Sequence, residues 1–282
     1  FRLPSTTPSS PLPISAETCD ALGVMLALNT VAPGLDDPEV EIRRRLFSVG
    51  AIDGATTSPD GHRYRFNVYR ENGATALAMR RLDDRFLSLT ELGLPAQLES
   101  FCSYPDGLVI VTGPTGSGKS TTLATLIDLI NRTRNGHIIT IEDPIEYRHQ
   151  SNKCLVHQRQ IGRDATSFNS ALVESLRQDP DVILVGEIRD EDTADMALRA
   201  AMTGHQVYST LHTNSAIGAI PRLLDIGILP DIMAGNIIGV IAQRLIRRLC
   251  PHCKTPYQAE AHESRGSRAN PSSPFFAAHL PT

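Results

Sequence analysis

The chain has 282 residues, of which 41% are hydrophobic and 21% are charged, as in an ordinary globular protein. The formal net charge of −4 and the isoelectric point near 6.1 exclude a global electrostatic attraction to nucleic acid or anionic lipid. The sequence holds no apolar run of about 18 residues, which excludes a predicted membrane-spanning helix. The five cysteines are scattered except for Cys250 and Cys253, so a disulfide framework is excluded and a reducing cytosol is favoured.

Composition divides the chain into four predicted segments. Residues 1–13 are rich in proline, serine and threonine, and we expect them to be disordered or a linker. Residues 14–98 are predicted to form a small mixed domain, and residues 99–258 a larger domain that alternates strands and helices. Residues 259–282 form a low-complexity tail for which we predict no regular structure.

The small domain contains one predicted hairpin. The stretch HRYRFNVYR at 62–70 alternates apolar and polar residues as a half-buried strand does. Residues 71–73, Glu-Asn-Gly, supply a turn, and residues 74–82 form the returning strand. Residues 90–95, TELGLP, are predicted to connect the two domains, because a glycine and a proline interrupt them.

The large domain begins with a buried strand, GLVIVTG at 107–113. A helix follows whose apolar residues are spaced i, i+3, i+4 and i+7: Leu123, Leu126, Ile127 and Ile130. Further strands are predicted at 137–143, 181–187 and 206–213, with a helix over 189–204. This order predicts an α/β fold with a mainly parallel sheet, in which ligands bind at the carboxyl ends of the strands.

The stretch GPTGSGKS at 113–120 fits the pattern of a phosphate-binding loop between a strand and a helix. We expect its backbone amides and helix start to bind nucleotide phosphates, Lys119 to reach the β- and γ-phosphates, and Ser120 to bind Mg²⁺. The alternative is a chance turn rich in glycine and serine. The predicted nucleotide-binding residues are Gly113, Pro114, Thr115, Gly116, Ser117, Gly118, Lys119, Ser120 and Thr121.

Carboxylates are concentrated in the stretch TIEDPIEY at 140–147. Glu142, Asp143 and Glu146 follow a predicted strand that Pro144 ends, so they should face the phosphates at the carboxyl edge of the sheet. Because Mg²⁺ prefers oxygen ligands, often through water, we predict that Glu142 and Asp143 contribute to a magnesium site. The alternative is a solvated acidic turn.

A third candidate is PDVILVGEIRD at 180–190, which has Gly186 where a magnesium-binding aspartate is expected and Glu187 one residue later. Glu187 is predicted to be a general base or to position the attacking water. The alternative is that Glu187 forms a salt bridge with Arg189 or another neighbour. In the stretch TGHQVYSTLHTN at 203–214, His205 and His212 are either γ-phosphate sensors or structural residues. Zinc is disfavoured there, because a cysteine or carboxylate partner at metal-binding spacing is missing.

These four stretches, in this order, resemble the Walker A, Asp-box, Walker B and His-box motifs of the secretion ATPase superfamily, the motors of type II secretion and type IV pili. The resemblance runs from about residue 60 to 257. It implies that Glu187 is the catalytic glutamate, that Glu146 is a second essential acid, and that both His205 and His212 line the site. It also implies a hexameric ring.

The family's architecture implies a RecA-like P-loop ATPase domain preceded by a small PAS-like α+β domain, with arginines supplied by the small domain of a neighbouring subunit. Arg63, Arg65 and Arg80 resemble those arginines. The alternative interpretation is that these three arginines only lie on a solvated face of a strand.

The stretch QRLIRRLCPHCK at 243–254 resembles the extension branch of the family more than the retraction branch. Zinc is unlikely, because Cys250 and Cys253 lack the second cysteine pair that a structural zinc site needs. The basic residues Arg244, Arg247 and Arg248 are either a solvated helix end or a contact for lipid or a partner.

The sequence is therefore interpreted as an ATP-hydrolysing hexameric motor that uses ATP and Mg²⁺ to power type II secretion or type IV pilus assembly. We expect it in the cytoplasm, peripheral to the bacterial inner membrane, with an inner-membrane platform protein as partner and no specific nucleic acid. Four alternatives remain: a retraction motor of the same family, a RecA-like DNA-translocating ATPase, a small-molecule kinase, and a shortened copy that binds ATP without hydrolysing it.

Overall fold

The computed structural model describes residues 14–30, 36–82, 85–247, 249, 252–257 and 275–278. The chain divides into two compact units, residues 1–243 and 244–282. In the second unit, strands β10 (Lys254–Tyr257) and β11 (Phe275–Ala278) pair antiparallel. Strand β11 lies in the tail for which the sequence predicts no regular structure. The predicted linker at 1–13 lies outside the described residues.

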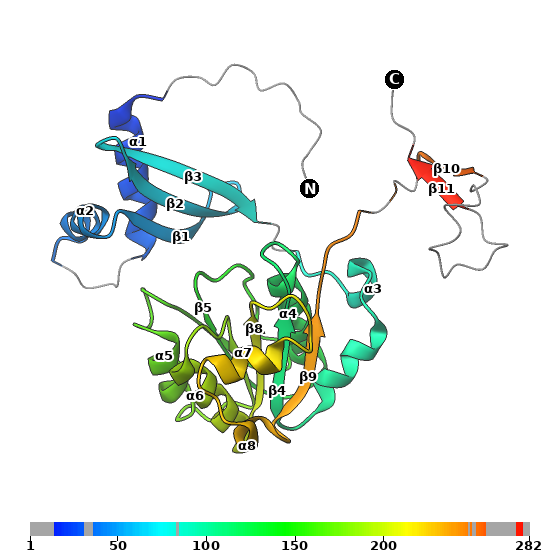
Figure 1. The fold of residues 1–282 in the computed structure, drawn as a ribbon. Helices are drawn as coiled ribbons and strands as arrows, with labels where there is room; N and C mark the ends of the chain where they lie inside the picture. The colour runs from blue at the N-terminus through cyan, green and yellow to red at the C-terminus, as the bar shows by residue number, and fades with distance from the viewer. Residues whose placement is uncertain are drawn as a thin grey trace. The chain divides into compact units, whose positions relative to one another are not determined.

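The first unit begins with a small antiparallel sheet in the order β1-β2-β3, seen in Figure 1 beside helices α1 and α2. Its elements are α1 (Ala16–Ala27), η1 (Leu28–Thr30), α2 (Pro38–Ser48), β1 (Ala51–Thr57), β2 (Arg63–Glu71) and β3 (Ala74–Leu82). Asn72 and Gly73 form the β2–β3 turn with φ of 50° and 82°, the left-handed values that a two-residue hairpin turn requires. The predicted hairpin at 62–82 is therefore confirmed.

The larger part of the first unit is built on a parallel sheet. Among the described residues it has six strands in the order β6-β5-β7-β8-β4-β9. The strands are β4 (Gly107–Thr112), β5 (Gly136–Glu142), β6 (Cys154–Gln160), β7 (Val182–Val185), β8 (Gln206–Leu211) and β9 (Ile237–Ala242). The predicted α/β fold with a mainly parallel sheet is confirmed. The edge strands β6 and β9 were not predicted.

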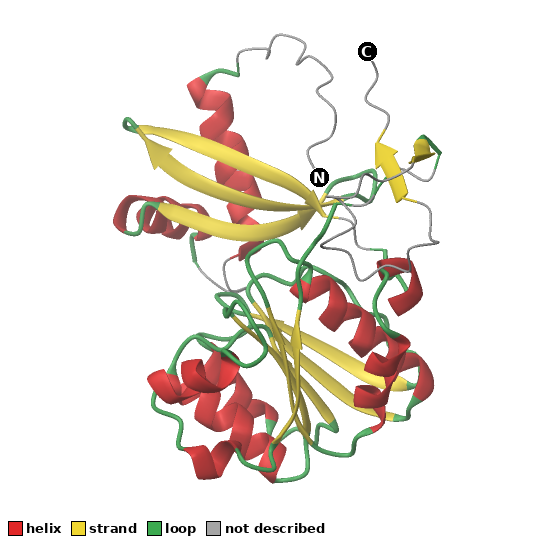
Figure 2. Cartoon of the chain, turned by 45° about the vertical axis from the view of Figure 1, so that its right-hand side comes forward, coloured by secondary structure: helices red, strands yellow, loops and turns green. Residues whose placement is uncertain are grey.

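Helices cover both faces of this sheet, as Figure 2 shows. They are α3 (Leu89–Leu92), η2 (Ala96–Ser103), α4 (Lys119–Thr133), α5 (Phe168–Ser175), α6 (Glu191–Met202), α7 (Ala219–Asp225) and α8 (Pro230–Met233). Alternate residues of one strand serve the two faces: Val109 and Val111 pack in the core with α4, whereas Leu108 and Ile110 pack with α5 and α6. Since β4, β7 and β8 are buried along their whole length, they form the centre of the domain.

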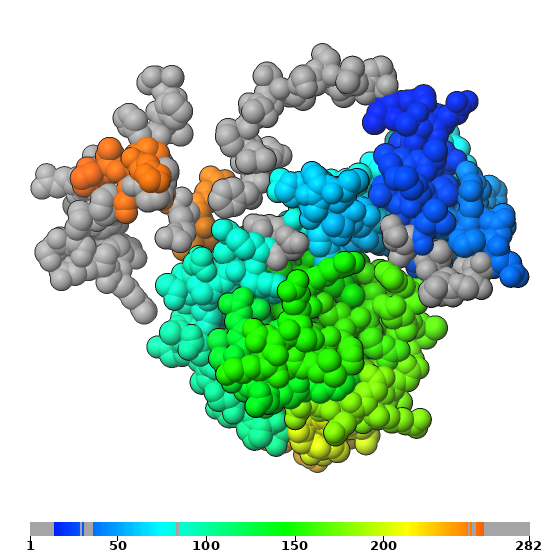
Figure 3. Space-filling view, turned by 180° about the vertical axis from the view of Figure 1, so that it is seen from behind, coloured from blue at the N-terminus to red at the C-terminus, as the bar shows by residue number. Residues whose placement is uncertain are grey.

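The segment between the two sheets packs with the parallel sheet. Leu89, Leu94 and Leu98 belong to the core that contains α4, ahead of the predicted domain boundary at residue 98. In the space-filling view, this teal segment lies against the green surface of the larger part (Figure 3). The connector thus packs with the core of the parallel sheet.

The same segment has an aromatic contact that predicts a pH effect. The rings of Phe86 and His149 lie 4.7 Å apart, and the Nδ1 atom of His149 is buried with no hydrogen-bond partner in the part of the chain that the structure describes. Burial lowers the pKa of His149 to about 4, because the charged ring would lose its hydration. Protonation therefore favours the unfolded chain, in which histidine titrates near its ordinary value.

We predict that the protein loses stability as the pH falls from about 6.5 to about 4, because the unfolded state binds this proton and the folded state does not. The contribution of His149 is about 3 kcal/mol at most. Urea unfolding across this pH range should give a flatter profile for His149→Leu than for the wild type. Gln97→Ala, at an exposed residue that does not titrate, should keep the wild-type slope. Equal slopes for wild type and His149→Leu would contradict the prediction.

Candidate active site

The loop between β4 and α4 has the backbone of a phosphate-binding loop. Gly113, Gly116 and Gly118 have φ of 146°, 76° and 91°, values that favour glycine. A Cβ atom on Gly113 would lie 2.3 Å from the carbonyl oxygen of Gln243, so a side chain does not fit there. Helix α4 begins at Lys119, directly after the loop, and its amino end adds a favourable dipole for an anion. The predicted strand–loop–helix setting is confirmed.

Lys119 lies folded over this loop. Its Nζ donates hydrogen bonds to the carbonyl oxygens of Gly113 at 2.9 Å and Pro114 at 3.3 Å, and the residue is 8% exposed. Burial lowers the pKa of Lys119, and the nearby charge of Glu187 opposes that shift. The Ser117 Oγ is buried and lacks a hydrogen-bond partner among the described residues. A buried cation and an unsatisfied hydroxyl within one loop are groups that a phosphate would satisfy.

The crown of the loop is open. Pro114, Thr115, Gly116 and Ser120 are exposed. The next residue, Thr121, lies 3.0 Å from Tyr147 through its hydroxyl, and this bond fastens the 143–147 segment to the first turn of α4. The acidic segment and the phosphate-binding loop are therefore neighbours in space.

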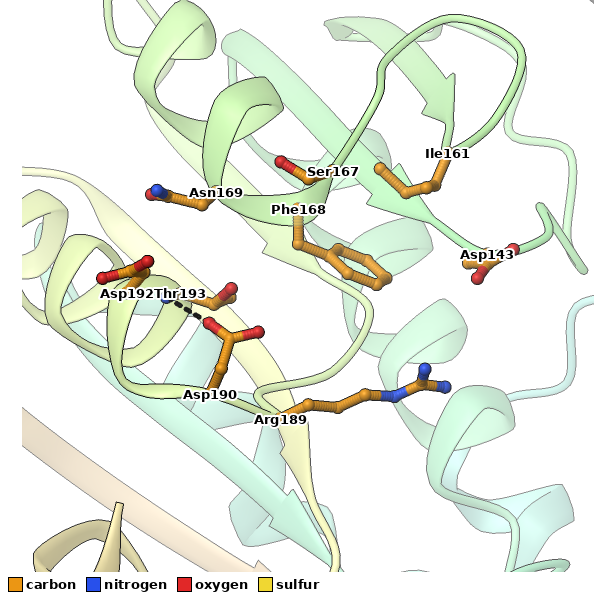
Figure 4. Close-up of a pocket in the computed structure, with 9 residues that line it drawn as sticks. All are labelled: Asp143, Ile161, Ser167, Phe168, Asn169, Arg189, Asp190, Asp192 and Thr193. Carbon is orange, nitrogen blue, oxygen red and sulfur yellow. Dashed lines mark hydrogen bonds between the residues drawn. The ribbon is translucent and has the colours of Figure 1, made fainter. Parts of the chain in front are cut away.

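Two of the predicted magnesium ligands have different surroundings. The Glu142 Oε1 accepts hydrogen bonds from the Thr140 hydroxyl at 2.7 Å and from Gln158 Nε2 at 3.1 Å, and burial raises the pKa of Glu142 to about 7. Asp143, by contrast, lines a cavity of about 360 Å³ together with Phe168 and Arg189 (Figure 4). Asp143 is accordingly the carboxylate with oxygens open to a ligand, whereas Glu142 holds β5 and β6 together.

The contacts of Gly186 bear on why the first carboxylate after β7 is Glu187, one residue after the position where a magnesium-binding aspartate is expected. Its amide donates to the carbonyl oxygen of Ile141 at 2.8 Å, and its own carbonyl accepts from the Thr210 hydroxyl at 2.7 Å. A Cβ atom at this position would lie 3.2 Å from the Ile141 carbonyl oxygen, which is tighter than an ordinary contact. A side chain at position 186 would therefore crowd the Ile141 carbonyl oxygen of β5, whereas Glu187 is the next position along the chain.

Glu187 extends at the same edge of the sheet. Its carboxylate is 16% exposed, forms an ion pair with Arg189 and lies 3.7 Å from the Nε2 atom of His212. The negative charge of Glu187 partly opposes the lowering of the Lys119 pKa by burial. The salt bridge with Arg189 was the alternative interpretation of Glu187, and the structure contains it.

His212 is held in this group by the end of its strand. Thr213 follows it, and its amide donates to the Thr112 hydroxyl at 3.0 Å, while that hydroxyl lies 2.9 Å from the Thr213 carbonyl oxygen. Thr112 directly precedes the phosphate-binding loop. The ends of β4 and β8 are therefore bonded to each other beside Lys119.

The resemblance implies that His205 also lines the site, but the structure places His205 outside this group. Strands β4 and β8 are parallel, with Gly107 opposite Gln206 and Thr112 opposite Leu211. His205 precedes β8, so it lies at the amino end of that strand, about 20 Å from its carboxyl end at about 3.3 Å per residue. Its Nδ1 lies 3.0 Å from the Ala200 carbonyl oxygen, a structural contact at the end of α6.

The candidate arginines lie on the antiparallel sheet. Arg63 donates to the carbonyl oxygens of Ile145 at 2.8 Å and Glu146 at 3.2 Å. Arg65 forms an ion pair with the Glu146 carboxylate at 3.4 Å. Arg80 is exposed opposite Arg65 in the strand register. Glu146, predicted as a second essential acid, is thus paired with an arginine of the same chain.

Sequence reasoning missed other residues that shape the site, above all Tyr147, Thr213 and Gln243. Their contacts join segments far apart in the sequence, and their local sequence gives no signal for them. Two residues singled out near the C-terminus of the chain, Arg248 and Cys250, lie outside the described residues. The expectation that Cys250 and Cys253 hold no zinc stays a prediction.

Comparison with known proteins identifies the family. A family model described as "Type II/IV secretion system protein" matches residues 65–275. The chain belongs to this family. Over 197 residues it is 45% identical to the type IV pilus retraction ATPase PilT of Pseudomonas aeruginosa, a match that covers 68% of this chain and 57% of that protein. Over 206 residues it is 47% identical to the type II secretion system protein E of the same species, covering 70% of this chain and 40% of that one.

Two solved structures share the fold. A crystal structure of the pilus retraction motor PilT with bound ADP has a TM-score of 0.69 and 47% identity, covering 72% of this chain and 61% of that chain. The ATPase DotB of Legionella pneumophila has a TM-score of 0.70 and 29% identity. This match covers 83% of this chain and 66% of the DotB chain. The chain therefore spans about half the length of the curated relatives named above. Within its described ranges, no helix is both long enough and apolar enough to cross a membrane.

Proposed function

We propose that the chain binds ATP at the loop of residues 113–120 and hydrolyses it, as the nucleotide-binding part of a secretion or pilus motor. The single observation that carries this proposal is the position of Lys119, which is buried and donates hydrogen bonds to the carbonyl oxygens of the loop after β4. Bound phosphate oxygens would take the place of those carbonyls as partners of the Lys119 ammonium group, a stronger charge-assisted interaction.

Glu187 is the residue that we assign to the chemical step. It would accept a proton from the water whose oxygen bonds to the γ-phosphorus, while the bond from that phosphorus to the bridging oxygen breaks and ADP leaves. Its ion pair with Arg189 and its proximity to His212 hold the carboxylate at the carboxyl edge of the sheet. His212 would respond to the γ-phosphate through this contact.

The residues present also fit a magnesium ion. Ser120 is exposed on the first turn of α4 and Asp143 is exposed just after β5, so each side chain would be free to offer an oxygen to the cation. Magnesium would neutralise phosphate charge during the transfer. Glu142 fits less well, because its Oε1 already accepts two hydrogen bonds and its pKa is raised to about 7.

We further propose that the working form is a homo-hexamer at the cytoplasmic side of the bacterial inner membrane, with a platform protein as partner. Relatives named for pilus retraction and for type II secretion are similar to the chain to nearly the same degree, so the proposal names the class of motor and not its direction. The net charge of −4 argues against the DNA-translocating alternative.

Light scattering combined with a phosphate-release assay tests this proposal. With a non-hydrolysable ATP analogue and Mg²⁺, the purified chain should assemble to about six times its mass of 30.7 kDa, and with ATP it should release phosphate. Assembly and nucleotide binding without phosphate release would instead indicate a chain that binds ATP without hydrolysing it. If the chain showed no nucleotide binding and no turnover, the proposed function would be contradicted. Strongly salt-dependent DNA binding would favour the DNA-translocating alternative.

A further inference from the structure

Gln243, which follows the edge strand β9, contacts the phosphate-binding loop from the side. Its amide donates to the Thr112 carbonyl oxygen at 2.8 Å, just before the loop, and its Oε1 accepts from the Thr122 hydroxyl at 2.7 Å, just after it. The Gln243 carbonyl oxygen and Nε2 also approach Gly113 and Gly118: Cβ atoms built on these glycines would lie 2.3 Å and 3.0 Å away. One residue therefore braces both ends of the loop.

The hydrogen bond from the Thr122 hydroxyl differs from the one that a threonine usually makes within a helix. A threonine within a helix commonly donates its hydroxyl to the carbonyl oxygen four residues earlier. Thr125, one turn further along α4, does this with Thr121 at 3.0 Å. Thr122 is fully buried, and its hydroxyl reaches instead across 121 positions of sequence to Gln243. A buried hydroxyl that depends on one distant acceptor makes the position of Gln243 specific.

The contact also does not follow from general core packing. Strand β9 is the edge of the sheet and pairs with β4 there. Its residues are partly exposed, and Gln243 itself is half-buried. An alanine at this position would leave the apolar core in place while removing the brace.

We propose that Gln243 is a positioning residue that holds the phosphate-binding loop in its nucleotide-binding conformation. This inference rests on the proposed function. Gln243 acts through the loop: by fixing Thr112 and Thr122, it sets the separation between the end of β4 and the start of α4, and hence the direction of the loop amides. Glutamine suits this place because it offers an acceptor to Thr122 and a neutral amide donor beside Gly118. Glutamate would bring a negative charge to a loop that must hold phosphates.

Calorimetric titration of the full chain with Mg-ADP tests the proposal. Gln243→Ala and Thr122→Val should each weaken ADP binding about tenfold, the loss expected for one hydrogen bond in a buried setting. Because the two residues act through one bond, the double variant should bind within about twofold of Gln243→Ala. Gln243→Glu should weaken binding more than alanine does. Thr122→Ser, which keeps the hydroxyl, and Gln97→Ala, at an exposed glutamine, should bind like the wild type.

Kinetics and folding separate positioning from a merely structural role. In ATP turnover, the KM of Gln243→Ala should rise about tenfold while kcat stays within about twofold, and circular dichroism should show a folded variant at the assay temperature. The proposal is overturned if Gln243→Ala binds ADP as tightly as the wild type, or if the losses of the two single variants simply multiply in the double variant. If the wild type itself binds no ADP, the proposed function fails first and this inference fails with it.

Discussion

Replacement of Glu187 with glutamine is expected to slow ATP hydrolysis by at least about 100-fold while ADP affinity changes by less than about threefold. Positioned general bases typically accelerate reactions by about 10² to 10⁴. Glutamine has nearly the shape of glutamate and can still accept a hydrogen bond from Arg189, but its amide cannot take a proton from water. The binding site should therefore remain, and the chemical step should be lost.

Phosphate release at saturating ATP measures the first quantity, and calorimetry with Mg-ADP the second. Glu174→Gln is a matched control, because Glu174 is an exposed glutamate that also pairs with an arginine, Arg159. This control should hydrolyse ATP at the wild-type rate. Turnover by Glu187→Gln within threefold of the wild type would show that Glu187 is only a salt-bridge partner of Arg189.

The second large effect is expected at Lys119. Lys119→Ala should weaken nucleotide binding at least about 100-fold, because it removes the cation that would contact the β- and γ-phosphates. The variant should stay folded for two reasons. Burial of the Lys119 charge is itself unfavourable, so its removal costs little stability. The loop carbonyl oxygens that lose their donor lie next to exposed residues, where water can replace it. Fluorescence titration with a labelled ADP and a thermal unfolding curve measure the two properties.

Lys153→Ala provides the comparison for this experiment, because Lys153 is an exposed lysine elsewhere on the domain whose Nζ contacts a helix-end carbonyl at 3.5 Å. It should bind nucleotide like the wild type. Retention of wild-type affinity by a folded Lys119→Ala variant would remove the basis for a phosphate site at this loop.

The sequence was informative where one local pattern determines both backbone and chemistry. The loop at 113–120 needs its glycines for positive φ values, and the apolar strand before it and the amphipathic helix after it are visible within residues 107–133. The central strands were also predictable, because burial on both faces makes them continuous apolar runs. Edge strand β6 was missed because it is half-exposed and mostly polar.

Contacts between distant segments could not be predicted. The position of His205 depends on the parallel register of β4 and β8. His205 precedes β8 and His212 follows it, so the two histidines lie at opposite ends of that strand. The partner of Glu146 depends on how a β2 arginine reaches the 143–147 segment. The bond between Gln243 and Thr122 joins residues 121 positions apart. Each of these is a property of tertiary packing, for which a local motif gives the residue type but not the neighbour.

The account depends on nucleotide phosphates binding at the loop beside Lys119, with Glu187 at the same edge of the sheet. Hydrogen–deuterium exchange of the full chain with and without Mg-ADP tests this most directly. We predict slower exchange in peptides covering residues 113–122 and 186–189, and no change at the amino end of β8 around His205. Protection confined to other segments, with the exchange of residues 113–122 unaltered at saturating ADP, would contradict the account.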